Sequence, residues 1–138
     1  MKIIYIKLFL RVSIAIGFIS AVADRFGFWS KENSAWGTWG NFLEYTKLLN
    51  PWAPESIINV IGIIATLAEV LLSIFLLIGF KTSLFAKVSG VLLLIFGISM
   101  TITLGIKAPL DYSVFSASAA AFGLSLIKEK YLEIDQLF

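Results

Sequence analysis

The sequence predicts an all-α membrane protein, a transmembrane antiparallel four-helix bundle in a single domain, on three observations. Hydrophobic residues make up 59% of the 138 residues and charged residues only 14%, which leaves a water-soluble domain too little polar surface to face solvent. Four segments approach or reach the roughly 20 apolar residues that a helix needs to cross a membrane. Short connections make the last three segments antiparallel neighbours.

The four predicted spans differ in the charged residues that they contain. The first carries Lys7 and Arg11, the second only Glu69, and the third Lys87 near one end. Hydrocarbon does not solvate charges, so each buried one needs a partner or water. The predicted elements are spans over residues 3–23, 57–80, 84–106 and 112–127, a long connection over residues 24–56 and a C-terminal tail over residues 128–138.

The first span also has features of a signal peptide. Lys2 and Lys7 precede an apolar stretch that ends in the small residues 21–23, as at a cleavage site. Arg11 interrupts the apolar run, which favours a membrane span. We therefore expect this segment to remain part of the protein.

The distribution of Lys and Arg predicts the orientation, because basic residues favour the cytoplasmic side of a membrane. Cytoplasmic termini place Lys2, Lys7, Lys81, Lys87, Lys128 and Lys130 inside, against Arg25, Lys31, Lys47 and Lys107 outside. We therefore expect a multi-pass protein of a bacterial inner (plasma) membrane, with both termini in the cytoplasm.

The connection over residues 24–56 is rich in aromatic side chains. It contains all the tryptophans of the chain, Trp29, Trp36, Trp39 and Trp52, and such rings favour the membrane–water interface. Trp39, Phe42, Leu43 and Leu49 share one face of a possible helix that Asn50-Pro51 would end. This predicts either an interfacial amphipathic helix or an ordered loop anchored by its tryptophans.

Arg11 and Glu69 are the ionisable residues deepest in the predicted spans. An unpaired charge near the bilayer centre costs roughly 2.5–3.5 kcal/mol on insertion scales. At 1.5 Å per residue, Arg11 lies about 12 Å from Ile3 and Glu69 about 16 Å from Phe80, at ends expected to share one membrane face. The similar depths predict a buried ion pair between the first two spans. This pair would either fix the helix register or belong to a ligand or proton site.

A second polar group is expected at the outer ends of the spans. It comprises Asp24, Arg25, Lys107 and Asp111. Charges in such positions usually cap helices and neutralise one another, since water reaches them. The alternative is that they line the mouth of a pocket.

The composition excludes several classes of site. The chain has no Cys and no His, which removes disulfides, thiol chemistry and imidazole metal ligands, and no metal site is expected. Serines at small-residue positions are read as helix packing, because no His is present to activate a hydroxyl. The dispersed basic residues give no nucleic-acid footprint. No classical catalytic constellation is visible.

Several short motifs together resemble the DoxX family over nearly the whole chain. They are Leu8-Phe9-Leu10-Arg11, Ala68-Glu69, Leu76-Leu77-Ile78-Gly79-Phe80-Lys81 and Asp111-Tyr112, in this order. The segments 24–27 and 107–113 resemble a DoxX subgroup with an enlarged first loop. The family positions that carry over are Arg11, Glu69, Asp111 and Lys81.

The resemblance implies a membrane subunit associated with a quinone-dependent oxidoreductase. The expected function is therefore an accessory, non-catalytic subunit that binds a lipophilic molecule such as a quinone near Arg11 and Glu69, in support of a membrane redox partner protein. The alternatives are an assembly or scaffold protein whose aromatic loop docks a partner, and a small transporter acting as a homo-oligomer.

Overall fold

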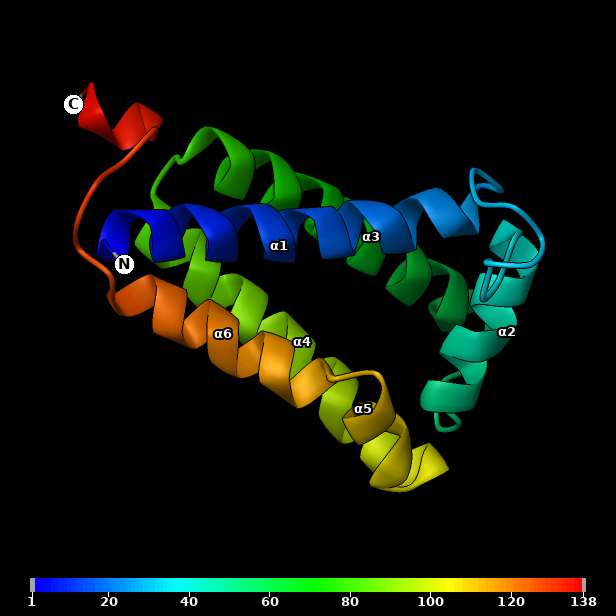
Figure 1. Cartoon of the computed structure of the whole chain (residues 1–138). Helices are drawn as coiled ribbons and strands as arrows, with labels where there is room; N and C mark the ends of the chain where they lie inside the picture. Colours follow the sequence, from blue (N-terminus) through cyan, green and yellow to red (C-terminus); the bar gives the residue numbers. More distant parts are fainter. Residues whose placement is uncertain (1, 138) are drawn as a thin grey trace.

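The computed structural model describes residues 2–137, and this part of the chain is helical without strands. Figure 1 shows the elements in order. They are α1 (Ile3–Arg25), α2 (Trp39–Leu49), α3 (Glu55–Ile78), α4 (Thr82–Leu104), α5 (Lys107–Asp111), α6 (Val114–Leu126) and the 3₁₀ turn η1 (Ile134–Gln136).

The long helices form two pairs that splay apart. Helix α1 lies beside α3, and α4 lies beside α6. The pairs meet near the chain termini and diverge toward α2 and α5, as Figure 1 shows. The buried core lies where the pairs meet and comprises Ile14, Ala15, Phe18, Leu72, Leu76, Ala86, Ala121 and Leu124. We call the space between the two diverging helix pairs the wedge, and the candidate site lies there.

Small residues set the close packing of α4 on α6. A Cβ atom added to Gly97 would lie 2.7 Å from the Phe115 ring, and one added to Gly90 would lie 3.0 Å from the Phe122 ring. The Ser118 hydroxyl donates to the Gly90 carbonyl at 2.7 Å. Helices in lipid associate through such close contacts, because lipid provides no hydrophobic drive between them.

Within residues 2–137, three helices, α1, α3 and α4, are long and apolar enough to cross a membrane. They expose rows of large apolar side chains, for example Ile64, Leu67 and Leu71 on α3. An apolar surface of this extent indicates contact with lipid. The structure therefore describes an all-helical protein with three candidate membrane spans.

The predicted fourth span, residues 112–127, corresponds to α6. Helix α6 has 13 residues, and Ser113 before it has a left-handed φ of 56°. The preceding residues form the short α5, and Pro109 lies inside it. Helix α6 starts two residues later and ends one residue earlier than expected, and it is about 20 Å long, shorter than the hydrocarbon core.

The aromatic connection contains a helix, α2, over residues 39–49. The Thr38 hydroxyl accepts from the Asn41 backbone N–H at 3.2 Å and so caps its first turn. The helix ends before Asn50 and Pro51, as their residue types predict. It packs across the open end of the wedge, against α3 and α4.

Candidate functional site

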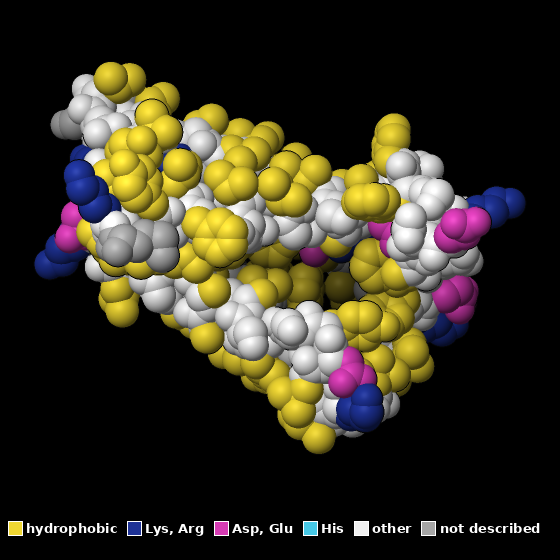
Figure 2. All heavy atoms as spheres, viewed as in Figure 1, with side chains coloured by type: hydrophobic (Ala, Val, Ile, Leu, Met, Phe, Trp, Pro, Cys, Tyr) yellow, Lys and Arg dark blue, Asp and Glu magenta, His cyan; other side chains and the backbone are white. Residues whose placement is uncertain are grey.

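An open cavity with a volume of about 1760 Å³ lies between the two helix pairs. Figure 2 shows it as a recess with mostly hydrophobic walls between α1 and α6. Every long helix contributes to the wall, and α2 covers the wide end. A concave apolar cavity with a few convergent polar groups is the usual form of a small-molecule site.

The cavity wall holds a buried ion pair. The Arg25 Nη1 atom lies 2.6 Å from the Glu69 Oε2 atom, and the two side chains are 3% and 2% exposed. Both residues line the cavity. Each charge reduces the cost of burying the other, because an unpaired charge in low dielectric is strongly unfavourable.

The geometry of this pair leaves hydrogen-bonding capacity unused. The Arg25 Nη1–H group donates to the Thr66 hydroxyl at 2.6 Å, and that hydroxyl donates to the Gly62 carbonyl at 2.8 Å. The Nη1 atom carries a second N–H group, and its contact with Glu69 Oε2 is the ion pair. Arg25 Nε is buried without a hydrogen-bond partner among residues 2–137, and Glu69 Oε2 is a buried acceptor that only the ion pair with Arg25 satisfies there.

Asp24, next to Arg25 in the chain, organises the loop that precedes α2. Its carboxylate accepts the backbone N–H groups of Ala35, Trp36 and Gly37 at 2.8, 3.0 and 3.3 Å, and the Ser34 hydroxyl. These bonds hold residues 34–37 against the end of α1. In the last turn of α1, Asp24 therefore binds the loop, whereas the neighbouring Arg25 lies at the cavity.

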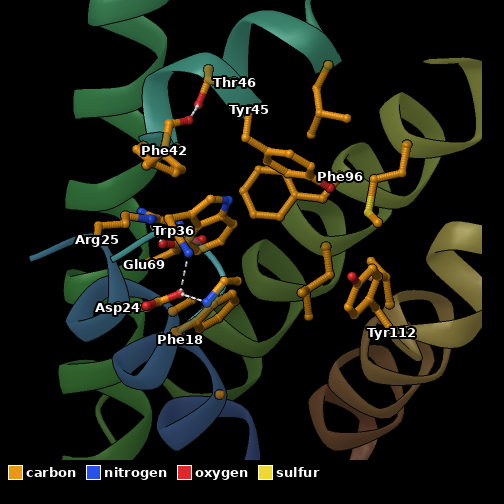
Figure 3. A pocket seen from close by; sticks show the side chains of 18 of the residues that line it. Phe18, Asp24, Arg25, Trp36, Phe42, Tyr45, Thr46, Glu69, Phe96 and Tyr112 are labelled. Atoms are coloured by element: carbon orange, nitrogen blue, oxygen red, sulfur yellow. Dashed lines mark hydrogen bonds and ion pairs between the residues drawn. The ribbon is translucent and has the colours of Figure 1, made fainter. Parts of the chain in front are cut away.

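Aromatic rings enclose the Arg25 guanidinium. Its central carbon lies 3.9 Å from the centroid of the Phe42 ring and 5.5 Å from that of Trp36, both within the range of a cation–π contact. Figure 3 shows Trp36 and Phe42 beside Arg25, with Phe96 and Tyr112 on the opposite wall. The cavity therefore has a polar, aromatic end and an apolar remainder.

The predicted Arg11–Glu69 pair is wrong. Glu69 pairs with Arg25, whereas Arg11 Nη1 lies 3.6 Å from the Glu133 carboxylate in the C-terminal tail. The Arg11 guanidinium also donates five hydrogen bonds at 2.8–3.1 Å to backbone carbonyls, those of Leu76, Leu77, Tyr131 and Leu132. Arg11 is fully occupied away from the cavity.

The physical reason lies in a C-terminal clamp formed by Lys7, Arg11, Glu133 and Asp135. The tail folds back across the end of the bundle, where Lys7 Nζ lies 2.7 Å from the Glu133 carboxylate. The Asp135 carboxylate accepts the N–H groups that begin α4, at 2.7 and 3.1 Å. The open carbonyls at the end of α3 attract a cation, so Arg11 binds them instead of Glu69.

The structure divides the predicted outer polar group. Asp24 and Arg25 are buried at the cavity, whereas Lys107 and Asp111 form an exposed ion pair within α5. Neither Lys107 nor Asp111 lines the cavity. The pocket-mouth interpretation therefore applies to the first two residues alone.

The tryptophans predicted at the interface occupy different places. Trp36 and Trp29 line the cavity, and the Trp29 indole N–H donates to the Ser20 carbonyl at 3.2 Å. Trp39 stacks on Phe26 with ring centroids 5.7 Å apart. Trp52 is 73% exposed.

Sequence reasoning missed Thr66 and Tyr45 as members of this site. Thr66 lies three residues before Glu69, and this spacing in the sequence indicates that the two side chains share one face of α3. Tyr45 and Tyr112 line the cavity from α2 and from the end of α5. No pattern in the sequence relates these two tyrosines.

The described residues offer a binding site without metal ligands. Within residues 2–137, no group of three or more acidic side chains could hold a metal ion. The arrangement can bind a molecule that is mostly apolar and has a small polar head. Comparison with family models, with curated proteins and with solved structures gives no match for this chain.

Proposed function

We propose that this protein is an accessory membrane subunit that binds a lipophilic molecule, such as a quinone, in the cavity between its helix pairs. The polar head of the ligand lies beside the Arg25–Glu69 pair, and the ligand serves a membrane redox partner. The DoxX-like motifs of the sequence support the redox connection, and the cavity supports the binding role.

The observation that carries the proposal is a large apolar cavity with a buried ion pair in its wall. Glu69 lies 14 residues into α3, about 21 Å from the start of a helix about 36 Å long. A charge at that depth in a membrane span is retained mostly for function. A packed bundle with a purely structural pair would not need an open cavity beside it.

We further propose four membrane crossings, with both termini in the cytoplasm of a bacterial cell. Helix α6 returns beside α4 as the fourth crossing, with the short α5 before it at one membrane face and the tail after Leu126 at the other. The wide end of the wedge, covered by α2, then lies at the outer surface. Exposed aromatic residues there, among them Phe28 and Trp52, suit the headgroup region.

The test is to purify the protein from quinone-containing membranes in mild detergent and to identify bound molecules by solvent extraction and mass spectrometry. We expect a quinone-like lipophile in near-stoichiometric amount. Protein that is recovered empty and that does not bind added quinone would contradict the proposal and would favour a scaffold role.

A matched pair of variants controls this test. Ala120 lines the cavity and Ala119, the preceding residue, is exposed outside it. Ala120→Phe should fill part of the cavity and reduce the bound lipophile, whereas Ala119→Phe should leave it unchanged. Equal retention in both variants would place the ligand elsewhere.

A further inference from the structure

We propose that the cavity selects an uncharged lipophile with a hydroxyl head, and that this molecule reaches it from the bilayer through the gap between α1 and α6. The inference rests on the proposed function, because it specifies the ligand class and the path of the same site. Two independent observations carry it: the charge and hydrogen bonding of the wall, and the small residues at the gap.

The charges of the cavity wall disfavour an anionic head. The basic residue in the described wall is Arg25, and the acidic ones are Asp24, Glu44 and Glu69. Arg25 is already paired with Glu69, and Asp24 is bonded by the loop amides. A carboxylate or phosphate head would therefore meet an excess of negative charge in a low-dielectric site.

The unused hydrogen-bonding atoms favour a hydroxyl. Glu69 Oε2 is a buried acceptor whose partner among residues 2–137 is the Arg25 Nη1 of the ion pair, which leaves one lone pair, and Arg25 Nε is a buried donor without a hydrogen-bond partner there. Buried polar groups normally have partners, so such a pair of atoms requires an explanation. A hydroxyl can donate to the first and accept from the second, whereas a ketone or quinone carbonyl can only accept.

The gap between α1 and α6 is lined by small side chains. Ser13, Gly17 and Ala21 contribute from α1, and Ala117 and Ala120 from α6. A Cβ atom added to Gly17 would meet no atom within 4 Å, so the gap is open at this point. Figure 2 shows the recess reaching the molecular surface between these helices. An apolar tail can therefore lie in the gap while the head reaches Glu69.

The ligand class is tested with three probes of equal tail length, namely an alkyl hydroquinone kept reduced, the corresponding quinone, and a fatty acid. Binding to the purified protein is measured by calorimetry. One additional hydrogen bond to a charged acceptor should make the hydroquinone bind roughly tenfold to a hundredfold tighter than the quinone. The fatty acid should bind weakest.

Variants test the residues that make the selection. Glu69→Gln provides an amide that can donate to a carbonyl, so the preference for the hydroquinone should shrink or disappear. Gly17→Trp should obstruct the gap and weaken the binding of both probes. Gly123→Trp is the control, because Gly123 also faces open space but lies outside the cavity. If Glu69→Gln does not fold, the comparison of probes on the unaltered protein decides alone.

The outcomes separate this inference from the proposed function. Equal affinity for hydroquinone and quinone, or a fatty acid that binds as tightly as either, would overturn the hydroxyl selection. Equal effects of Gly17→Trp and Gly123→Trp would overturn the path between α1 and α6. Failure of all three probes to bind would instead contradict the proposed function itself.

Discussion

Arg25, the last residue of α1, holds its guanidinium 2.6 Å from the carboxylate of Glu69 in the middle of α3. The Arg25 side chain lies in the cavity wall, where Thr66 and two aromatic rings also contact it. A pair that is buried but incompletely hydrogen-bonded is retained at a cost in stability, which is typical of a site prepared for a ligand.

The C-terminal clamp should contribute strongly to stability. Arg11→Gln leaves Glu133 with Lys7 alone and removes most of the hydrogen bonds to four carbonyls, so it should lower the free energy of unfolding by about 3–5 kcal/mol. Denaturation in detergent, followed by circular dichroism, measures the loss. Glu129→Gln is the control, because only the backbone carbonyl of Glu129 is used, by Lys7. Similar stability of the two variants would show that the tail does not hold the bundle end.

Gly97 should be intolerant of even one methyl group. Gly97→Ala places a carbon 2.7 Å from the Phe115 ring, and such overpacking costs about 1–3 kcal/mol. Gly123→Ala on α6 meets open space, so better helix propensity should make it neutral or stabilising by up to about 1 kcal/mol. Thermal unfolding of both variants in the same detergent distinguishes them, and a stable Gly97→Ala variant would contradict the close packing of α4 on α6.

Tyr45 should titrate at unusually high pH. Burial in the cavity wall raises the pKa of its phenol, and the charge of a nearby Tyr112 phenolate raises it further. Because the folded-state pKa is raised, the contribution of neutral Tyr45 to stability is complete below the ordinary pKa of about 10 and is lost as the pH rises through the folded-state value. The phenolate absorbance of the native protein minus that of Tyr45→Phe gives this titration. A normal pKa would mean that Tyr45 faces water.

Asp111 should matter little for folding, despite its place in the DoxX-like motif. Its pairing with Lys107 joins exposed side chains one turn apart on α5, and such pairs contribute at most about 0.5 kcal/mol. Asp111→Asn should therefore unfold within about 0.5 kcal/mol of the unaltered protein. A loss of several kcal/mol would point to a partner for Asp111 that the fold of the single chain does not contain.

The helices could largely be predicted from the sequence, and the ion pairs could not. Apolar runs predicted the three long helices to within a few residues, and the shared face of Trp39, Phe42 and Leu49 indicated α2 as one of two alternatives, the other being an ordered loop. These features are local. The partners of Arg11 and Glu69 depend on the axial register of α1 against α3 and on the position of the C-terminal tail, neither of which is local. A mostly polar tail gives no periodic signal, so the position of Glu133 over the bundle end was not predictable.

The short helix α5 was not predicted, for a related reason. Residues 107–111 were expected to form a turn, but they form α5, and Ser113 between α5 and α6 adopts a left-handed conformation. A single backbone angle of this kind is decided by tertiary packing.

The most direct test of the account is a double-mutant cycle on Arg25 and Glu69. Arg25→Gln and Glu69→Gln each remove one charge, and Arg25→Gln should cost about 3–5 kcal/mol because it leaves the carboxylate buried and unpaired. The free energies of unfolding in detergent should show a coupling of about 1–3 kcal/mol between the two changes. The same cycle with Arg11→Gln and Glu69→Gln should be additive. Additive effects for Arg25 with Glu69, or coupling between Arg11 and Glu69, would contradict the site described for this protein.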